Sequence, residues 1–257
     1  TDSFAATGLP AGLGIDESTG LISGTPSTEG TYGVTIQASN LAGSRPSNLT
    51  LHVKDYSRWE YTAPITFPGY EGNETLTDFP VYLEINPGID SFSYEQFASP
   101  AGFDIRFVGP DGAEELKYEP GEWNPEGVSS FWVRVPELKA GTTITAKWGN
   151  PNALTQPDYC LNGSIWNRYH AVWHMEGDDP TVIRESRGSL HGTATNFVEN
   201  PRVPGVIGKA LSFDGVNDYV NLPIEAHPPG DAKQLTISFW MKMKFLMVVL
   251  VVEDVVS

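Results

Sequence analysis

Hydrophobic and polar residues alternate in short runs along most of the chain. The runs at residues 32–38, 49–53, 79–85, 131–135 and 143–148 place an apolar side chain at every second position. A period of two puts alternate side chains on opposite faces of a strand, so each run predicts a half-buried β-strand. No stretch of convincing length has the 3.6-residue period of an amphipathic helix. The pattern therefore predicts an all-β protein.

Turn-forming residues separate these runs. The chain contains 26 Gly and 20 Pro, which supply many turns. The Asp-Glu-Ser-Thr-Gly sequence at residues 16–20 predicts a tight turn between two short apolar strands, and Asn-Leu-Ala-Gly at 40–43 predicts another. Further turns are expected at residues 110–112 and 140–141. The spacing of strands and turns over residues 56–150 is typical of a β-sandwich.

The last third of the chain contains three more strand-like runs. Residues 210–213 precede an Asp-Gly turn, residues 219–222 begin a second strand, and residues 235–241 alternate with Leu235, Ile237 and Phe239 on one face. Residues 171–176 are expected to form the opening strand of the same region. Together they predict a further β-domain after residue 168.

Length and charge limit the classes of function. The chain has 257 residues, enough for more than one domain, with 16 Lys and Arg against 32 Asp and Glu, a formal net charge of -16. Such a surface repels phosphates and argues against a nucleic-acid partner. The single cysteine, Cys160, cannot form an intrachain disulfide. The apolar run at residues 245–252 is far shorter than the roughly 20 residues that span a bilayer, so we expect no membrane insertion within this chain.

Residues 1–55 carry a recognisable set of motifs. The sequence shows GLPAGL at residues 8–13, TGLISGTP at 19–26 and GTYGVTI at 30–36. It resembles the Ig-like (cadherin-like, dystroglycan-type) repeat of bacterial surface proteins, of which it covers the later part. The resemblance implies an Ig-like sandwich fragment that acts as a spacer or adhesive repeat. The acidic calcium-ligand patterns of cadherins are missing, so calcium is not carried over to this repeat.

Residues 56–150 resemble a bacterial domain of unknown function. The motifs are GFDIRF at residues 102–107, ELKYE at 115–119, which is expected to form a strand, FWVRVP at 131–136 and the closing WGNP at 148–151. Domains of this type precede laminin-G modules and occur beside ExbB/TolQ-type proton-channel proteins. The resemblance implies a β-sandwich without an established activity. Residues 151–168, which contain two prolines among polar residues, are expected to be a linker.

Residues 169–257 resemble a concanavalin A-like, laminin-G-like jelly roll. The shared motifs are GKALSFDG at residues 208–215, DYV at 218–220 and TISFW at 236–240. The resemblance implies a partial jelly roll that lacks its later strands. The tail after Met241 departs from the family and indicates a truncated or frame-shifted gene end; a buried or aggregation-prone strand is the alternative. The chain begins at Thr1 without a signal peptide, and we expect it to be a fragment of a longer extracellular or cell-surface protein of a bacterium.

The resemblance to the jelly roll also suggests a metal site. Relatives often hold a structural calcium at a loop edge, and calcium takes 6–8 oxygen ligands. The candidate ligands here are Glu176, Asp178, Asp179 and Asp214. Solvated acidic turns without a metal explain the same residues, so both interpretations stay open.

The sequence shows none of the residue patterns that indicate an acid pair, a zinc site or a serine nucleophile. Jelly-roll glucanases place two or three acids along one strand, but Pro180 and Thr181 follow the acids at 176–179 and no second Glu stands at the required spacing. His170 and His174 lie four apart on an expected strand, roughly 13 Å from each other, which disfavours zinc. No Gly-x-Ser-x-Gly elbow is present. We therefore expect a protein without catalytic residues.

The function expected from these resemblances is non-catalytic binding or adhesion, with a polysaccharide or cell-surface glycan as partner. Aromatic rings stack on sugars, and Trp123, in a turn-like setting, is the least core-like of the 7 tryptophans. Two alternatives remain: the chain belongs to a polysaccharide-degrading enzyme, of which a glycoside hydrolase is the most plausible class, or it is a purely structural surface stalk.

Overall fold

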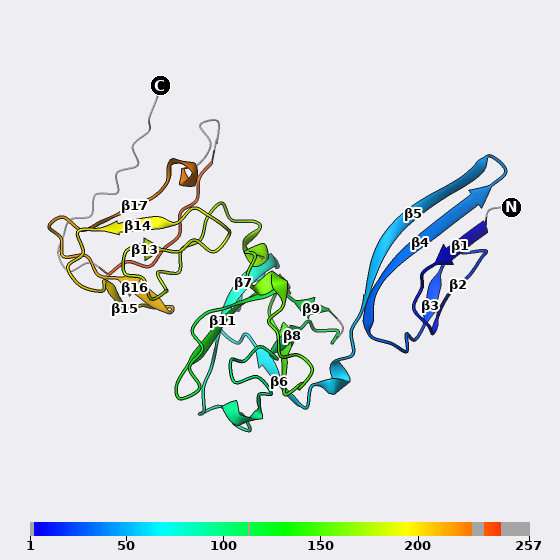
Figure 1. The fold of residues 1–257 in the computed structure, drawn as a ribbon, viewed down its shortest axis with the longest axis horizontal. Coiled ribbons are helices and arrows are strands. Elements are labelled where there is room, and N and C mark those ends of the chain that lie inside the picture. Colours follow the sequence, from blue (N-terminus) through cyan, green and yellow to red (C-terminus); the bar gives the residue numbers. More distant parts are fainter. Residues whose placement is uncertain (1–2, 113, 228–233, 243–257) are drawn as a thin grey trace. The chain divides into compact units, whose positions relative to one another are not determined.

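A computed structural model describes residues 3–112, 114–227 and 234–242 (Figure 1). As the alternating pattern predicts, the fold is all-β, with short 3-10 turns between antiparallel strands. The chain divides into two compact units, described separately below. The first unit comprises Thr1–Leu76, Ser93–Leu116 and Glu137–Gln156, and the second comprises Thr77–Phe92, Lys117–Pro136 and Pro157–Ser257.

The first unit begins with a three-stranded antiparallel sheet in the order β1-β4-β5 (Figure 1). Its strands are β1 (Ser3–Thr7), β4 (Gly30–Asn40) and β5 (Gly43–Val53), and a short hairpin of β2 (Leu13–Ile15) and β3 (Ile22–Gly24) accompanies it. Asn40 pairs with Gly43 across the β4–β5 turn, and Ile15 pairs with Ile22. Both predicted turns are confirmed.

The remainder of the first unit forms a four-stranded sheet in the order β6-β12-β8-β9. The strands are β6 (Tyr61–Thr66), β12 (Thr143–Trp148), β8 (Arg106–Val108) and β9 (Glu115–Leu116), accompanied by the 3-10 turns η1 (Tyr56–Arg58) and η2 (Tyr94–Gln96). Phe107 and Ile144 are completely buried, because the apolar positions of β8 and β12 face the core. The predicted strand at residues 143–148 is confirmed at both ends.

A buried aspartate organises the loops of this sheet. Asp104 has no exposed surface, and its carboxylate accepts hydrogen bonds from the backbone N–H groups of Ala98, Ser99 and Gly149 at 3.0, 3.0 and 2.7 Å. The Asp104 carbonyl accepts a further bond from Trp59 Nε1 at 2.7 Å. These bonds satisfy a charge that would otherwise be costly to bury.

The second unit contains a sheet in the order β10-β11-β7 and two smaller sheets. The first sheet is built from β10 (Tyr118–Pro120), β11 (Ser129–Leu138) and β7 (Leu76–Ile85), although the first residue of β7 and the last two of β11 belong to the first unit. The smaller sheets have the orders β13-β14-β17 and β15-β16. Their strands are β13 (Val182–Ile183), β14 (Gly192–Thr195), β15 (Arg202–Pro204), β16 (Lys209–Leu211) and β17 (Tyr219–Asn221). The predicted strands near residues 210–213 and 219–222 are therefore present.

Three 3-10 turns complete this unit: η3 (Asp158–Cys160), η4 (Ser164–Trp166) and η5 (Ile224–Ala226). The first two lie in residues 151–168, where a linker is expected, and they bury Cys160, Ile165 and Trp166.

Three expected strands differ from the structure. The strand expected at residues 115–119 is interrupted at Lys117, because β9 pairs with β8 while β10 pairs with β11. Residues 171–176 form only an isolated bridge between Trp173 and Glu185. Residues 235–241 are not a half-buried strand: no strand of the described chain pairs with them, and Ile237 and Trp240 are 55% and 72% exposed. Alternation alone is insufficient where no neighbouring strand supplies hydrogen bonds.

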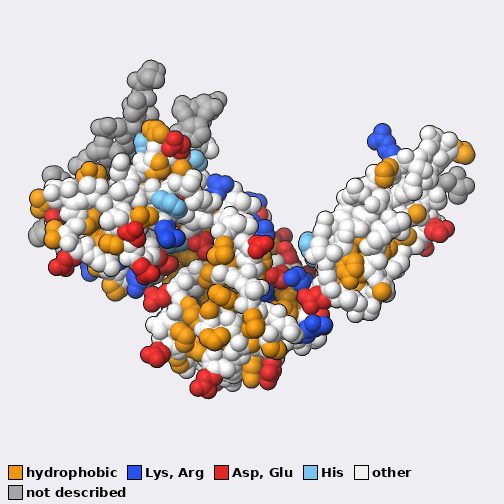
Figure 2. Space-filling view, viewed as in Figure 1, with side chains coloured by type: hydrophobic (Ala, Val, Ile, Leu, Met, Phe, Trp, Pro, Cys, Tyr) orange, Lys and Arg blue, Asp and Glu red, His pale blue; other side chains and the backbone are white. Residues whose placement is uncertain are grey.

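Residues 245–252, whose apolar run raised the question of a buried strand, lie outside the described residues. Within the described chain, no helix has the length and hydropathy needed to cross a membrane. Figure 2 shows Asp and Glu side chains over the visible face of both units, in keeping with the excess of acidic residues in the sequence.

Candidate functional site

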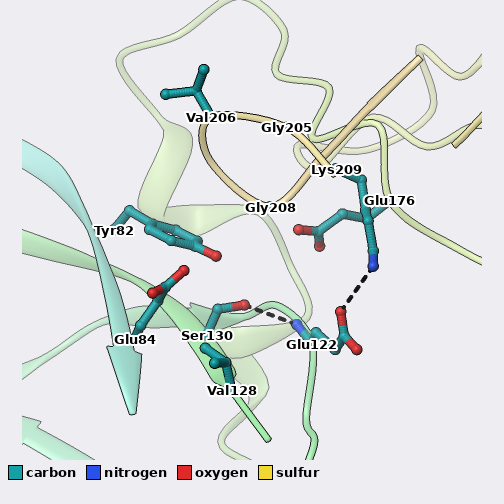
Figure 3. A pocket seen from close by; sticks show the side chains of 10 residues that line it. All are labelled: Tyr82, Glu84, Glu122, Val128, Ser130, Glu176, Gly205, Val206, Gly208 and Lys209. Carbon is teal, nitrogen blue, oxygen red and sulfur yellow. Dashed lines mark hydrogen bonds and ion pairs between the residues drawn. The ribbon is translucent and has the colours of Figure 1, made fainter. Parts of the chain in front are cut away.

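A small acidic pocket lies entirely within the second unit (Figure 3). Its volume is about 180 Å³. β7, the connection between β10 and β11, and the segment around β15 and β16 contribute its walls. The lining residues are Tyr82, Glu84, Glu122, Val128, Ser130, Glu176, Gly205, Val206, Gly208 and Lys209. Three carboxylates against one ammonium group give the pocket a negative potential.

β7 supplies the aromatic and one of the acidic groups. Tyr82 and Glu84 are two residues apart, so the strand places both on one face. The ring of Tyr82 packs at a tilt against Trp132, with 5.1 Å between ring centroids. Burial raises the pKa of Tyr82 above its usual value, which keeps its hydroxyl protonated at neutral pH. This hydroxyl can both donate and accept a hydrogen bond.

Ser130 lies between Glu84 and Glu122, and Lys209 lies beside Glu122 (Figure 3). The backbone N–H of Glu122 donates to Ser130 Oγ at 3.0 Å, and Lys209 Nζ lies 3.4 Å from Glu122 Oε2. Both side chains of this ion pair are about half exposed, at 42% and 53%, so it contributes little to stability. Its effect is to orient the two groups at the pocket.

Glu176 lines the pocket next to Gly208. Gly208 has a φ of +57°, and a Cβ atom there would lie 2.6 Å from Glu176 Oε1. A side chain at this position would displace the carboxylate from where it now lies, and the positive φ favours glycine there in any case. Burial raises the pKa of Glu176, and the negative charges of Glu119 and Glu122 raise it further, while Lys209 acts in the opposite direction.

These groups determine what the pocket can bind. Ionised carboxylates accept hydrogen bonds, and Tyr82 adds a hydroxyl and the edge of an apolar ring. A polar wall with several acceptors and one aromatic residue provides partners for a ligand that carries many hydroxyl groups. The pocket therefore has the chemistry of a small polar binding site.

A second polar cluster in the same unit centres on Glu119 of β10. Trp166 Nε1 donates a hydrogen bond to Glu119 Oε2, and Ser186 Oγ donates to Oε1 at 2.8 Å. Burial raises the pKa of Glu119, while these two hydrogen bonds act in the opposite direction. Trp166 and Ser186 lie far from Glu119 in the sequence. Their hydrogen bonds to Glu119 therefore connect residues 166–186 to the sheet that contains β10.

His174 lies between two aromatic rings in the same cluster. Its ring stacks on Trp132 with centroids 5.0 Å apart and contacts Trp166 at 5.1 Å. Its Nε2 atom is buried, lies 3.8 Å from Glu119 Oε1 and has no hydrogen-bond partner within the described chain. Burial lowers the pKa of His174 to about 4, so the ring is neutral at physiological pH. The structure thus shows a buried histidine packed against aromatic rings.

The four acids expected to bind calcium are not brought together. Glu176 faces the pocket, and Asp178 is exposed. Asp179 Oδ1 accepts hydrogen bonds from the backbone and side chain of Thr181, and Asp214 Oδ1 accepts from Val216 N at 2.7 Å. Within residues 3–112, 114–227 and 234–242, no three His, Cys, Asp or Glu side chains gather closely enough to hold a metal ion. The four acids therefore do not fit a common calcium site in this arrangement, and calcium binding stays a prediction.

Trp123, the aromatic residue expected at a sugar-binding surface, lies outside the pocket lining. It is half-buried and packs edge-on against Phe131, with ring centroids 6.4 Å apart. Its role in ligand binding stays a prediction.

Sequence patterns missed most of the pocket. Among its lining residues, the sequence singles out only Glu176 as a candidate and does not single out Tyr82, Glu84, Glu122 or Lys209. Tyr82 and Glu84 stand at the polar positions of an alternating strand, which shows that they share the face opposite the apolar one. No local signal shows that residues 205–209 approach this strand.

Comparisons with known proteins cover parts of the chain. Residues 1–54 match the family described as "Putative Ig domain", and residues 101–160 match the family described as "Domain of unknown function (DUF2341)". The comparison with curated proteins found no match.

A solved structure described as a "putative alpha-galactosidase/melibiase" from Bacteroides fragilis is 33% identical over 21% of this chain and 12% of that chain, with a TM-score of 0.20. Because the match spans 12% of that chain, it carries no argument about activity. The chain is thus similar to an Ig-type domain in its first part and to the domain of unknown function in its middle part.

Proposed function

We propose that this chain is part of a bacterial extracellular or cell-surface binding protein, and that the acidic pocket recognises carbohydrate without catalysing a reaction. The observation that carries the proposal is the pocket lining, in which three carboxylates and Tyr82 surround a space of about 180 Å³. Sugar hydroxyls donate hydrogen bonds to carboxylates, and an aromatic ring offers an apolar surface to a pyranose. Residues 169–257 would form a partial concanavalin A-like module, and residues 1–54 would act as a spacer.

The similarity of residues 1–54 to an Ig-type domain supports a surface location. The similarity of residues 101–160 to a domain of unknown function supports a modular architecture and gives no activity. A function must be derived from the site rather than from the fold, so the pocket is the place to test it.

The test is retardation of the purified chain in native gels cast with a panel of soluble polysaccharides, run with calcium and with chelator. We expect slower migration with at least one glycan. The variant Glu84→Lys should abolish it, because Glu84 lines the pocket with its carboxylate beside Tyr82 (Figure 3) and is exposed, so the substitution replaces an acceptor by a positive charge without disturbing a core. We expect at least about a tenfold loss of affinity, which corresponds to about 1.4 kcal/mol.

The matched control is Glu126→Lys, at a glutamate that is exposed and outside the lining. It should bind like the unmodified chain. Absence of retardation by every glycan, in a sample shown to be folded, would contradict the proposal and favour a structural stalk. Retardation that chelator removes would support the calcium hypothesis and direct mutations to Glu176 and Asp214.

A further inference from the structure

Three asparagines of the chain stand in the Asn-x-Ser/Thr pattern of N-linked glycan acceptors. They are Asn48 in Asn-Leu-Thr, Asn73 in Asn-Glu-Thr and Asn162 in Asn-Gly-Ser. Transfer of a glycan requires that the side-chain amide and the hydroxyl two residues later enter the cleft of a transferase. The segment must therefore be exposed and free of competing hydrogen bonds, and the structure distinguishes the three sites on this basis.

Asn48 lies within a regular strand. It pairs with Thr35 in the ladder between β4 and β5, and its Oδ1 atom accepts a hydrogen bond from Thr35 Oγ1 at 2.8 Å. Thr50, which would present the hydroxyl, pairs with Gly33 in the same ladder. Entry into a transferase cleft would require this part of the sheet to open, at the cost of its hydrogen bonds.

Asn162 lies in a packed turn between η3 and η4. Its Oδ1 atom accepts a hydrogen bond from Ser164 N at 3.0 Å, and Ser164 Oγ donates to the Tyr159 carbonyl at 3.3 Å. Gly163 between them is buried, and a Cβ atom there would lie 2.5 Å from Ser186 O. Both groups that a transferase reads are therefore already engaged in the fold.

Asn73 is different in each respect. Residues 71–75 lie in the loop between β6 and β7, and all five are exposed. Within the described chain, the side chains of Asn73 and Thr75 have no hydrogen-bond partner. The Tyr70 hydroxyl donates to the Glu74 carbonyl at 2.8 Å, which shapes the loop without engaging Asn73.

The charge around Asn73 adds a further distinction. Glu71 stands two residues before Asn73, whereas Pro46 and Cys160 occupy the equivalent positions before Asn48 and Asn162. An exposed carboxylate at this position can form an ion pair with a basic residue of a transferase. Glu71 is exposed and available for such a pair. Of the three sites, Asn73 alone combines an acidic neighbour with an exposed and unengaged acceptor.

We propose that Asn73 is a site of N-linked glycosylation, recognised together with Glu71 and Thr75. In the reaction, Asn73 Nδ2 attacks C1 of the first sugar of a polyprenyl-pyrophosphate-linked oligosaccharide. The C1–O bond breaks, its electron pair leaves with the lipid pyrophosphate, and the amide proton passes to a base of the transferase. The inference depends on the extracellular location in the proposed function and is independent of whether the pocket binds glycan.

The test is co-expression of the full chain, carrying a signal peptide for export to the bacterial periplasm, with a bacterial oligosaccharyltransferase and its lipid-linked heptasaccharide donor. A transferable acceptor peptide in a second exported protein shows that the machinery is active. Intact-mass spectrometry should show one added glycan on the chain, and peptide mapping should place it on Asn73.

The variant Asn73→Gln should lose the added mass, while Asn48→Gln and Asn162→Gln should retain it. Glu71→Gln should reduce the glycosylated fraction at least about tenfold, because it removes the charge that a basic transferase residue would pair with. Glu71→Gln keeps the size of the side chain, and the three Asn→Gln variants lengthen it by one methylene group, all at exposed positions. A circular dichroism spectrum checks each fold. An unmodified chain beside a modified reporter, or a glycan that peptide mapping places on Asn48 or Asn162 instead, would overturn the proposal. Neither result affects the gel test of the pocket, so the two proposals fail separately.

Discussion

Two buried carboxylates, Asp104 in the first unit and Glu119 in the second, hold their surroundings in different ways. Asp104 has no exposed surface and accepts hydrogen bonds from three backbone N–H groups. Glu119 is 20% exposed at its side chain and accepts from the side chains of Trp166 and Ser186. Backbone donors fix loop geometry whatever the neighbouring residue types are. Side-chain donors make the arrangement depend on the identity of particular distant residues.

The largest effect is expected at Asp104. Asp104→Ala leaves two buried N–H groups and the half-buried N–H of Ala98 without their acceptor. Each such loss costs about 1–3 kcal/mol, so the free energy of unfolding of the first unit should fall by about 5 kcal/mol. Urea denaturation with hydrogen exchange would locate the loss in this unit. The exposed residue Asp90, changed to Asn, serves as the control. A loss below about 1 kcal/mol would contradict the role given to Asp104.

The next effect concerns the donor to Glu119. Trp166 is 3% exposed, and Trp166→Ala removes both its packing and its hydrogen bond, which should cost the second unit about 3–4 kcal/mol. Trp240 is 72% exposed, so Trp240→Ala should change the unfolding free energy by less than about 0.5 kcal/mol. Denaturant titration measures both effects. Equal effects of the two substitutions would contradict the prediction that Trp166, unlike Trp240, stabilises the second unit.

A pH series examines the histidine beside Glu119. The pKa of His174 falls from 6.5 to about 4 on folding, so the unfolded chain binds this proton more readily. Its contribution to stability is complete above pH 6.5 and is lost as the pH falls from 6.5 towards 4. The expected loss is about 3 kcal/mol for a shift of this size.

The variant His174→Phe keeps an aromatic ring between Trp132 and Trp166 and cannot take up a proton. Between pH 6.5 and 4, the unfolding free energy of the unmodified chain should therefore fall by about 3 kcal/mol more than that of the variant. The unfolding free energy of both proteins is measured by urea denaturation at each pH. Parallel pH profiles would show that protonation of His174 does not cause the loss of stability below pH 6.5.

The smallest effect tests a third carboxylate, Glu176, which is only half-buried. Gly208→Ala places a Cβ atom 2.6 Å from Glu176 Oε1 at a φ of +57°, whereas Gly215→Ala meets nothing within 4 Å at a φ of +80°. Both should lose about 1–2 kcal/mol of stability from the left-handed backbone. Only Gly208→Ala should also weaken glycan retardation, because it displaces Glu176. Equal retardation of Gly208→Ala and Gly215→Ala would show that the position of Glu176 does not affect glycan binding.

Sequence patterns predicted the strands much better than the site. Alternation located β4, β7, β11 and β12, since a strand with one buried face imposes a period of two on its own residues. The same pattern failed at residues 235–241, where alternation is clear but no neighbouring strand is present in the described chain. Alternation records a preference for a half-buried surface, and the partner strand decides whether that surface exists.

The sequence by itself determined the all-β class, the turns at residues 16–20 and 40–43, the acidic surface and the glycan-acceptor pattern at Asn73. These properties depend on residues close together in the chain, where backbone geometry and charge act locally. Only the tertiary structure decided which acids meet. It placed Glu176 beside Gly208 in the pocket and kept Asp179 and Asp214 in their own turns. It also packed His174 against Trp132 and Trp166. Contacts between distant segments depend on how whole sheets pack, and no local pattern encodes that packing.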